Sequence, residues 1–261
     1  MTPQNSKELK EKGYTIIRNV VDEEWINVLK DAIDKAFIKH RNIQIKNNND
    51  IHTDGVALHV LLSNPVFIQF LEYLQKLGFF ESLQQNYFNS KCIINSFSAL
   101  NNLPNQPNFS AVVHRDLRFY SGDFNVMINC LLMVDDFSID NGGTYLLPYS
   151  HLEERKPTDK EFFDNAVQAV GNKGDILLFN ANVWHSSAPN KTQDDRRAIP
   201  ITVSKSFMKQ LLDYPRAIGY DKIDSFTYEM QQLLGYHSRV PASLDEWYQP
   251  EDKRFYKKHQ D

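Results

Sequence analysis

The sequence predicts a mainly β core with flanking α-helices. From about residue 91 to residue 204, short β-rich runs alternate with turn signals. Before this region apolar residues recur at helical spacing, and after it helix signals return. The length of 261 residues suits one catalytic domain. We therefore predict a single domain, 1–261, with a core at about 91–204. Residues 1–90 would supply supporting helices, and residues 205–261 would supply support and a substrate lid.

Two helices are predicted in the N-terminal third, after a short β-like segment at 14–20. The first begins after Asp22, a suitable N-cap, and places apolar residues at positions 25, 28, 29, 32, 33, 36 and 37. The second opens at Asn64-Pro65 and ends at Gly78, because proline suits the first position of a helix. The polar run 47–50 between them is predicted to be a loop.

Six strands are predicted in the core, which at this spacing indicates a sandwich or a barrel. Turns at 140–143 and 171–175 connect neighbouring strands. Pro200 lies inside the last run and predicts an edge or a bulge there. The predicted strands are 92–99, 110–120, 125–134, 144–147, 174–179 and 198–204.

Composition excludes several classes of protein. The net charge is −4, so there is no electrostatic footprint for nucleic acid, and we expect no nucleic-acid partner. No apolar run approaches the roughly 20 residues of a membrane helix, and the N-terminus lacks a signal-peptide pattern. We therefore expect no membrane span.

Only two cysteines are present, Cys92 and Cys130, each in an apolar stretch. This excludes a disulfide framework and argues against a cysteine-based zinc site. Buried thiols of a cytoplasmic protein are the simplest interpretation. Any metal site would therefore be built from histidine and carboxylate.

The segment His114-Arg115-Asp116-Leu117 spells the catalytic-loop tetrad of protein kinases. Kinase chemistry also needs an asparagine five residues after the aspartate, where this chain has Ser121, and an upstream Gly-rich loop that is missing. The segment also lies in a predicted strand. Side chains two apart share one face of a strand, so His114 and Asp116 would project together while Arg115 points away.

A histidine and a carboxylate on one face are two thirds of a 2-His-1-carboxylate triad, which binds non-heme Fe(II) and leaves positions open. His185, after the strand that begins at Gly174-Asp175, is the best candidate for the third ligand. A single strand histidine is more often an ordinary packed or surface residue. The combination with a later histidine and a following arginine is far more specific.

This combination resembles the phytanoyl-CoA dioxygenase-like branch of the Fe(II)/2-oxoglutarate oxygenases, over roughly residues 91–204. Tyr149 departs from the glycine more often found at its position. The matching motifs are His114-x-Asp116, the Gly-rich hairpin 141–151 that ends in Pro148-Tyr149-Ser150-His151, the strand start Gly174-Asp175, and His185 with Arg196-Arg197 downstream.

The resemblance implies a double-stranded β-helix core (jelly-roll, cupin-like) in which His114, Asp116 and His185 hold Fe(II). It implies 2-oxoglutarate as cosubstrate and O2 as oxidant, with release of succinate and CO2. The expected reaction is hydroxylation of an unactivated C–H bond of a small organic substrate. Asp116 favours hydroxylation, since halogenases of the family carry a small residue there.

The resemblance also implies cosubstrate contacts. Arg196, eleven residues after His185, falls where the family pairs an arginine with the C5 carboxylate of 2-oxoglutarate, a task that suits the guanidinium fork. Arg197 is the competitor, and strand alternation would put the two on opposite faces. Ser187 resembles a hydroxyl that helps hold the same carboxylate. Asn95 and Tyr120 are further candidates to line the cosubstrate pocket, although both also fit ordinary strand residues.

The remaining histidines are not expected to bind metal. His151 is interpreted as a structural or pocket-rim residue, and the others are expected to be solvated. These others are His40, His52, His59, His237 and His259.

Two alternatives from other classes stay open at this point. The same three ligands could hold Zn²⁺ in a hydrolase or isomerase on a cupin-like barrel. The domain could also be a non-catalytic jelly-roll binding module. The partner we expect is a small-molecule substrate, chosen by the N-terminal helices, the region 47–63 and the tail after Ser204. The sequence carries no prediction of oligomeric state.

Overall fold

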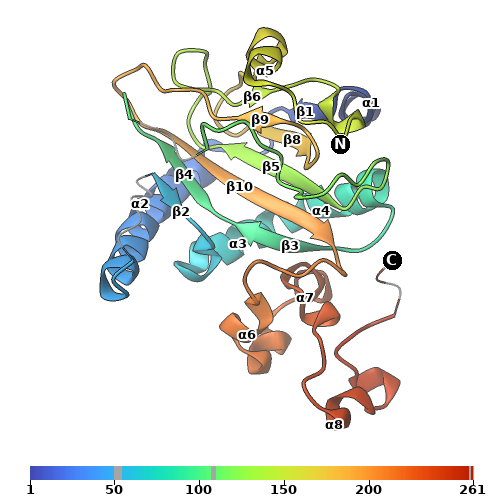
Figure 1. Ribbon diagram of the computed structural model, residues 1–261. Helices are drawn as coiled ribbons and strands as arrows, with labels where there is room; N and C mark the ends of the chain where they lie inside the picture. Colours follow the sequence, from blue (N-terminus) through green and yellow to red (C-terminus); the bar gives the residue numbers. More distant parts are fainter. Residues whose placement is uncertain (50–54, 107–109, 259, 261) are drawn as a thin grey trace.

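A seven-stranded antiparallel sheet forms the centre of the molecule, in the computed structural model that describes residues 1–49, 55–106, 110–258 and 260 (Figure 1). The strand order is β1-β8-β5-β10-β4-β2, and β3 pairs with the other half of β10. The strands are β1 (Tyr14–Ile17), β2 (Val56–Ala57), β3 (Cys92–Phe97), β4 (Ala99–Asn102), β5 (Met127–Met133), β8 (Ile176–Asn180) and β10 (Arg196–Lys205).

A second, three-stranded sheet packs on one face of the large sheet. It consists of β6 (Tyr145–Leu146), β7 (Val167–Gln168) and β9 (His185–Ser186), in the order β7-β6-β9. Leu131 and Leu177 of the large sheet share an apolar cluster with Leu146 and with Val183, which lies just before β9. The core is therefore a two-layered antiparallel β structure, as the strand spacing predicted.

Helices cover the opposite face of the large sheet (Figure 1). Alternate residues of β5, such as Ile128 and Cys130, point into the main apolar core with the buried faces of α2 and α3. The side chain of Asp22 caps the first turn of α2, and Asn64 caps α3, which confirms both predicted helix starts. The helices before the core are α1 (Pro3–Lys12), α2 (Glu23–Lys46), η1 (Val60–Leu62), α3 (Pro65–Lys76), α4 (Phe79–Leu83) and the π-helical turn η2 (Gln84–Phe88).

Helices also appear within the core and after it. The turn η3 (Ser150–Leu152) and α5 (Asp159–Asn165) lie between β6 and β7. The helical tail is confirmed, and within the described residues no helix is long and apolar enough to cross a membrane. The tail contains α6 (Tyr214–Ile218), η4 (Tyr220–Ser225), α7 (Tyr228–Leu234), η5 (Tyr236–Ser238), α8 (Leu244–Trp247) and η6 (Glu251–Lys253).

The strand predicted at 110–120 is wrong. Within this segment only His114 forms a β-bridge, to His185. The amides of Asp116 and Leu117 both donate to the carbonyl of Ala181, at 3.1 and 3.2 Å. Two successive amides on one carbonyl bend the chain, so a regular ladder cannot continue. The segment is therefore a loop tied to the large sheet at a few points.

Of the two features predicted at Pro200, an edge or a bulge, the structure has a bulge-like irregularity. It has no edge there, because β10 lies between β5 on one side and β3 and β4 on the other. The amide of Ser98, between β3 and β4, donates to the carbonyl of Pro200, and the register with β3 shifts between Thr202 and Val203. A proline is tolerated there because its partner strand is interrupted opposite to it.

Two histidines are buried and serve the fold. His237 was expected to be solvated, but it is 2% exposed and its Nε2 donates to Gln231, while burial lowers its pKa to about 4. His151 is buried and its Nε2 donates to the carbonyl of Lys10 in α1. His151 thus has the structural role that was one of its two interpretations, whereas the burial of His237 contradicts the prediction that it is solvated.

Two further histidines are half-buried rather than solvated. His40 contacts the hydroxyl of Ser63, and His59 contacts the hydroxyl of Tyr214. Burial lowers the pKa of both imidazoles. The predictions for His52, His259, Asp50 and the central part of the region 47–63 lie outside the described residues.

Candidate metal centre and cosubstrate pocket

His114, Asp116 and His185 come together where the loop after residue 110 meets β9. The three residues each offer one ligand atom, and these atoms lie within 4.8 Å of one another. The Nε2 atoms of His114 and His185 are each 3.7 Å from an oxygen of Asp116. Two nitrogens and one carboxylate in this arrangement are the donor set of a non-heme Fe(II) triad.

Both imidazoles are held in the form that binds a metal. The Nδ1 of His114 donates to the carbonyl of Val112 at 2.7 Å, and that of His185 donates to the carbonyl of Val183 at 3.0 Å. A carbonyl only accepts, so each Nδ1 carries the proton and each Nε2 keeps a free lone pair. These lone pairs lie on the side of Asp116, so the residues fit a divalent metal.

The backbone explains why the two histidines face each other. His114 and His185 exchange two hydrogen bonds, of 3.0 and 2.8 Å, as an antiparallel pair does. Their ring centroids are 4.2 Å apart, and Phe179 of β8 packs edge-on against His185. A single bridge therefore fixes both rings, even though the flanking loop is not a strand.

Burial differs across the triad, and the difference leaves one side open. His185 is 7% exposed, and burial, followed by the nearby His114, lowers its pKa against the opposing effect of Asp116. The side chains of His114 and Asp116 are 37% and 34% exposed. A metal bound here would therefore have protein on one side and accessible positions on the other.

Asn129 of β5 is a site residue that the sequence interpretation missed. Its amide donates to Asp116 at 2.5 Å, and its carbonyl oxygen accepts from the hydroxyl of Thr202 on β10 at 3.1 Å. Asn129 is 5% exposed in a strand that is otherwise apolar apart from Cys130. A polar residue in the middle of an apolar run was the available signal, since buried amides need partners.

We predict that Asn129→Leu weakens Fe(II) binding by about 10–100-fold, because the carboxylate of Asp116 loses the donor that orients it. Metal titration of the purified variant measures this effect. Thr202→Val is the matched control, because it removes only the hydrogen bond to the carbonyl oxygen of Asn129. It is expected to cause a smaller loss of Fe(II) affinity. Equal affinity in Asn129→Leu and the wild type would contradict an orienting role.

Arg196 lies inside the β structure. It is 3% exposed, its Nη2 donates to the carbonyl of Gly142 at 3.0 Å, and its guanidinium carbon lies 4.1 Å from the ring centroid of Phe137. Its Nε has no hydrogen-bond partner among the described residues. Burial lowers its pKa to about 10, so the side chain stays charged at neutral pH. A buried cation with an unused donor fits a carboxylate ligand.

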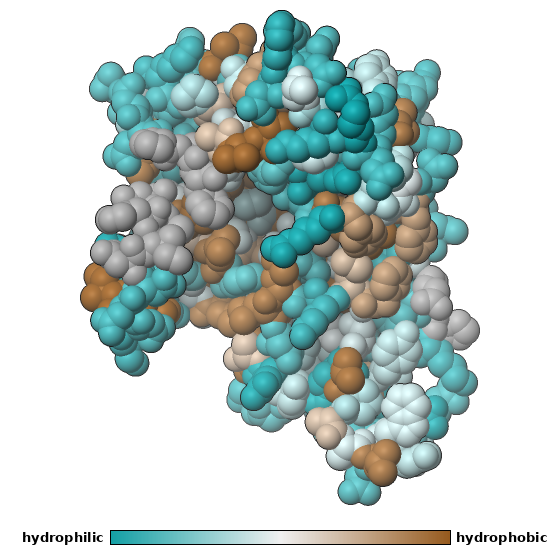
Figure 2. Space-filling view, in the orientation of Figure 1, coloured by the Kyte–Doolittle hydropathy of each residue, from teal (hydrophilic) through white to brown (hydrophobic). Residues whose placement is uncertain are grey.

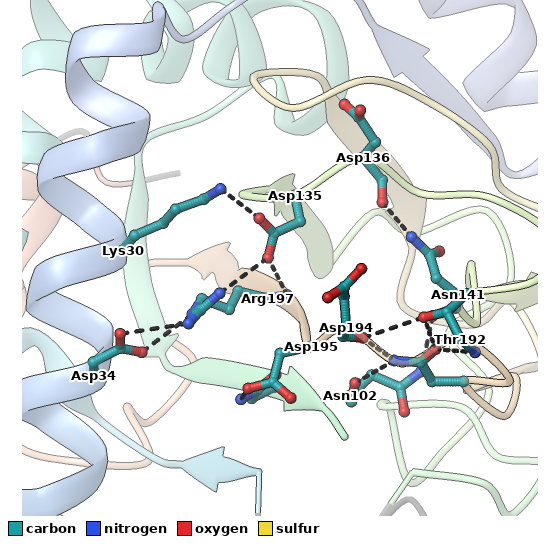
Figure 3. A network of polar contacts seen from close by, with 12 residues as sticks. Lys30, Asp34, Asn102, Asp135, Asp136, Asn141, Thr192, Asp194, Asp195 and Arg197 are labelled. Atoms are coloured by element: carbon teal, nitrogen blue, oxygen red, sulfur yellow. Dashed lines mark hydrogen bonds and ion pairs between the residues drawn. The ribbon is translucent and has the colours of Figure 1, made fainter. Parts of the chain in front are cut away.

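Arg197 points to the opposite face, as alternation predicted. Its side chain contacts Asp34 of α2 at 3.1 Å and Asp135 at 3.5 Å, and Lys30 of α2 also reaches Asp135 (Figure 3). These contacts join the long helix to the sheet. Arg196, unlike Arg197, lies on the same face of β10 as Thr202. Thr202 donates to Asn129, and Asn129 donates to Asp116.

Ser187 and Asn95 differ in their burial and in the segments that they contact. Ser187 follows β9, is half-buried, and its amide donates to the carbonyl of Ser110. Asn95 of β3 is 2% exposed, and its amide donates to the carbonyl of Lys209 at 3.0 Å and to Ser204 at 3.4 Å. Asn95 thus joins β3 to β10 and to the start of the C-terminal segment.

Tyr120 and Arg115 lie on another side of the His114 loop. The hydroxyl of Tyr120 donates to the carbonyl of Leu152 at 2.8 Å. Arg115 points away from His114 and Asp116, and its guanidinium carbon is 5.0 Å from the ring centroid of Trp184. These contacts tie the loop to η3 and to the residue just before β9.

Comparisons with known proteins identify the family to which the chain belongs. The phytanoyl-CoA dioxygenase (PhyH) family model matches residues 9–198. "Uncharacterized protein Rv1501" of Mycobacterium tuberculosis is 29% identical over 258 residues, which cover 95% of this chain and 92% of that protein. "Dioxygenase cdmA" of Talaromyces verruculosus is 25% identical over 251 residues, which cover 89% and 82% of the two chains.

A solved structure shares the fold. The non-heme alpha ketoglutarate dependent carbocyclase SnoK from nogalamycin biosynthesis superposes with a TM-score of 0.60 at 15% identity, covering 78% of this chain and 84% of that one. This likeness confirms the cupin-like core. The family match covers most of the chain, and it includes the triad and Arg196. The chain belongs to the phytanoyl-CoA dioxygenase family and is an Fe(II)- and 2-oxoglutarate-dependent dioxygenase.

Proposed function

We propose that this dioxygenase hydroxylates an unactivated C–H bond of a small organic substrate, with release of succinate and CO2. The observation that carries the proposal is the convergence of His114, Asp116 and His185, with one side accessible. Iron bound there would supply, together with O2 and 2-oxoglutarate, the oxidising power for C–H cleavage. The chain's own residues supply geometry and charge.

In this proposal His114 and His185 present two neutral nitrogens, and Asp116 presents one negative oxygen held by the Asn129 amide. The carboxylate at position 116 occupies coordination space, which favours hydroxylation over halide transfer. The protonated Nδ1 atoms cannot compete for the metal because both are engaged by backbone carbonyls. The ligand set is thus pre-arranged before the metal binds.

Arg196 is proposed to hold the C5 carboxylate of 2-oxoglutarate, using the guanidinium nitrogen that has no partner among the described residues. Ser187 is proposed to support the same carboxylate. Asn95 and Tyr120 donate to the backbone carbonyls of Lys209 and Leu152, so we propose that they shape the pocket walls. A buried cation with an unused donor has no evident task in a zinc hydrolase or a binding module, so it favours the oxygenase over both alternatives.

The test is the stoichiometry of the reaction. Purified protein with Fe(II) is expected to consume 2-oxoglutarate and to form succinate one for one, faster when a screened small molecule is a substrate. The product should carry one oxygen atom from labelled O2. Zn²⁺ in place of Fe(II) is the control and should give no succinate. Full turnover in a chelated, iron-free sample would show that the proposed function is wrong.

A further inference from the structure

A large cavity lies in the C-terminal part of the molecule. Its volume is about 1270 Å³, and no proposed metal or cosubstrate residue lines it. Pockets that enclose drug-sized ligands measure roughly 300–1,000 Å³, so this cavity has room for a larger organic molecule. Its walls come from residues 206–213 after β10, from the turns around α7 and α8, and from the tail 254–258. Figure 1 shows these segments, in orange to red, below the large sheet.

One wall of the cavity contains a cation with unused hydrogen-bond donors. The side chain of Arg239 is only 8% exposed, and its guanidinium carbon lies 3.9 Å from the ring centroid of Tyr220 and 3.3 Å from that of Phe255. Its Nε and Nη2 have no hydrogen-bond partner among the described residues. The ion pair from Nη2 to Glu246 is 3.7 Å long, which is too long for a hydrogen bond, and the other oxygen of Glu246 accepts from the amide of Ala242.

This arrangement favours an anionic ligand. A guanidinium held between two rings keeps its planar fork in one orientation, and buried donors without acceptors are costly. A carboxylate that reached the guanidinium would give both Nε and Nη2 an acceptor. The rest of the lining agrees, because five lysine and arginine side chains line the cavity against three carboxylates, whereas the whole chain has a net charge of −4. The cavity is therefore locally basic in an acidic protein.

The rest of the lining favours an apolar ligand body. Several of the large hydrophobic side chains that the protein exposes gather in this one place, where the lower part of Figure 2 shows pale and brown residues. A concentration of exposed apolar side chains in a concave region marks a binding site more than it marks a solvated surface. They include Phe207 at 59%, Leu211 at 71%, Val240 at 82% and Trp247 at 61% exposure.

The cavity shares a wall with the surroundings of the metal ligands. Met208 lines the cavity and also packs against the cluster that contains Leu117, the residue directly after Asp116. Lys209 lines it too, and the carbonyl of Lys209 accepts from Asn95 on the large sheet. The segment 206–212 is thus common to the cavity and to the region of the metal site.

We propose that this cavity binds the prime substrate, and that the substrate is a carboxylate with a broad apolar body whose carboxylate pairs with Arg239. The identification of the ligand as the substrate rests on the proposed function. Binding in the cavity itself requires neither iron nor 2-oxoglutarate. Binding of the substrate carboxylate at Arg239 would position the reacting carbon of the substrate, while the carboxylate itself stays away from the metal.

The test uses the full-length, iron-free protein and calorimetric titration with dodecanoate, with dodecanol as the neutral probe. One saturable site is expected for dodecanoate in the wild type. Arg239→Gln is expected to weaken it by about tenfold or more, because a charge-assisted pair is lost. Val240→Asp places a negative charge on an 82%-exposed position of the lining, so it should weaken dodecanoate binding without disturbing the fold, while Val240→Asn should not. Arg155→Gln, on an exposed ion pair in another part of the chain, is the general control.

The outcomes separate this inference from the proposed function. Absence of saturable dodecanoate binding, or equal affinity in the wild type, Arg239→Gln and Val240→Asp, would overturn the cavity proposal even if succinate is formed normally. Variant-sensitive binding without any 2-oxoglutarate consumption would overturn the proposed function and leave the anion site in place. For a substrate found by screening, Arg239→Gln should raise the KM for that substrate, whereas the KM for 2-oxoglutarate should stay unchanged. An unchanged substrate KM would show that the cavity is not the substrate site.

Discussion

Asp116→Ala is expected to abolish Fe(II)-dependent succinate formation and to lower Fe(II) affinity by at least about a hundredfold. Loss of a residue that only orients a metal ligand costs about 10–100-fold, so loss of the ligand itself should cost at least as much. The substitution leaves two neutral imidazoles and removes the only negative donor of the cluster. Because the side chain of Asp116 is 34% exposed, its removal should not unfold the core.

Metal titration and succinate measurement on the same sample check this result. Asp123→Ala is the matched control, since Asp123 is an exposed carboxylate on the same loop. It should retain wild-type iron affinity and turnover. Iron binding of wild-type strength by Asp116→Ala, with unchanged thermal stability, would mean that the metal is held elsewhere.

Arg196→Gln is expected to raise the KM for 2-oxoglutarate by about tenfold or more, with a smaller effect on Fe(II) binding. The physical reason is the loss of a buried, charge-assisted pair to a carboxylate. Glutamine is neutral, so the variant also removes a buried cation and should fold. Arg196→Lys keeps the charge but loses the fork, so its KM should lie between the two.

Arg197→Gln is the control for position and charge. It breaks the contacts to Asp34 and Asp135 on the other face of β10, so it should lower the free energy of unfolding by about 1 kcal/mol or less and leave the KM for 2-oxoglutarate unchanged. Steady-state kinetics with varied 2-oxoglutarate decide the matter. If Arg197→Gln raised this KM and Arg196→Gln did not, the assignment of the two arginines would be reversed.

The clustering of the proposed metal ligands was predictable although their secondary structure was not. The interpretation of His114 and Asp116 as strand residues relied on side chains two apart sharing a face. The structure keeps only one bridge, at His114, and places Asp116 through an amide contact to Ala181. The two side chains still converge because each is held separately against the end of the large sheet. Local spacing selected the candidate residues, while long-range hydrogen bonds bring them together.

Several contacts that the structure shows left only weak local signals in the sequence. Asn129 stands as one polar residue in an apolar strand, and nothing near it in sequence indicates that it contacts Asp116. Arg239 lies in a polar stretch of the tail, and only packing places it between Tyr220 and Phe255. His237 was predicted to be solvated because its neighbours in sequence are polar, yet the tail folds back and buries it. Such contacts join residues that are remote in the chain.

The residue types and their spacing were enough to limit the possible chemistry and to place the main helices. The scarcity of cysteine left histidine and carboxylate as metal donors, the caps and apolar spacing specified α2 and α3, and alternation separated Arg196 from Arg197. Long-range packing decides which groups come into contact. It brings Asn129 to Asp116, and it packs the C-terminal segments around Arg239. Side-chain periodicity depends on neighbours a few residues apart, whereas these meetings depend on strand order and on how the tail packs, which no local pattern encodes.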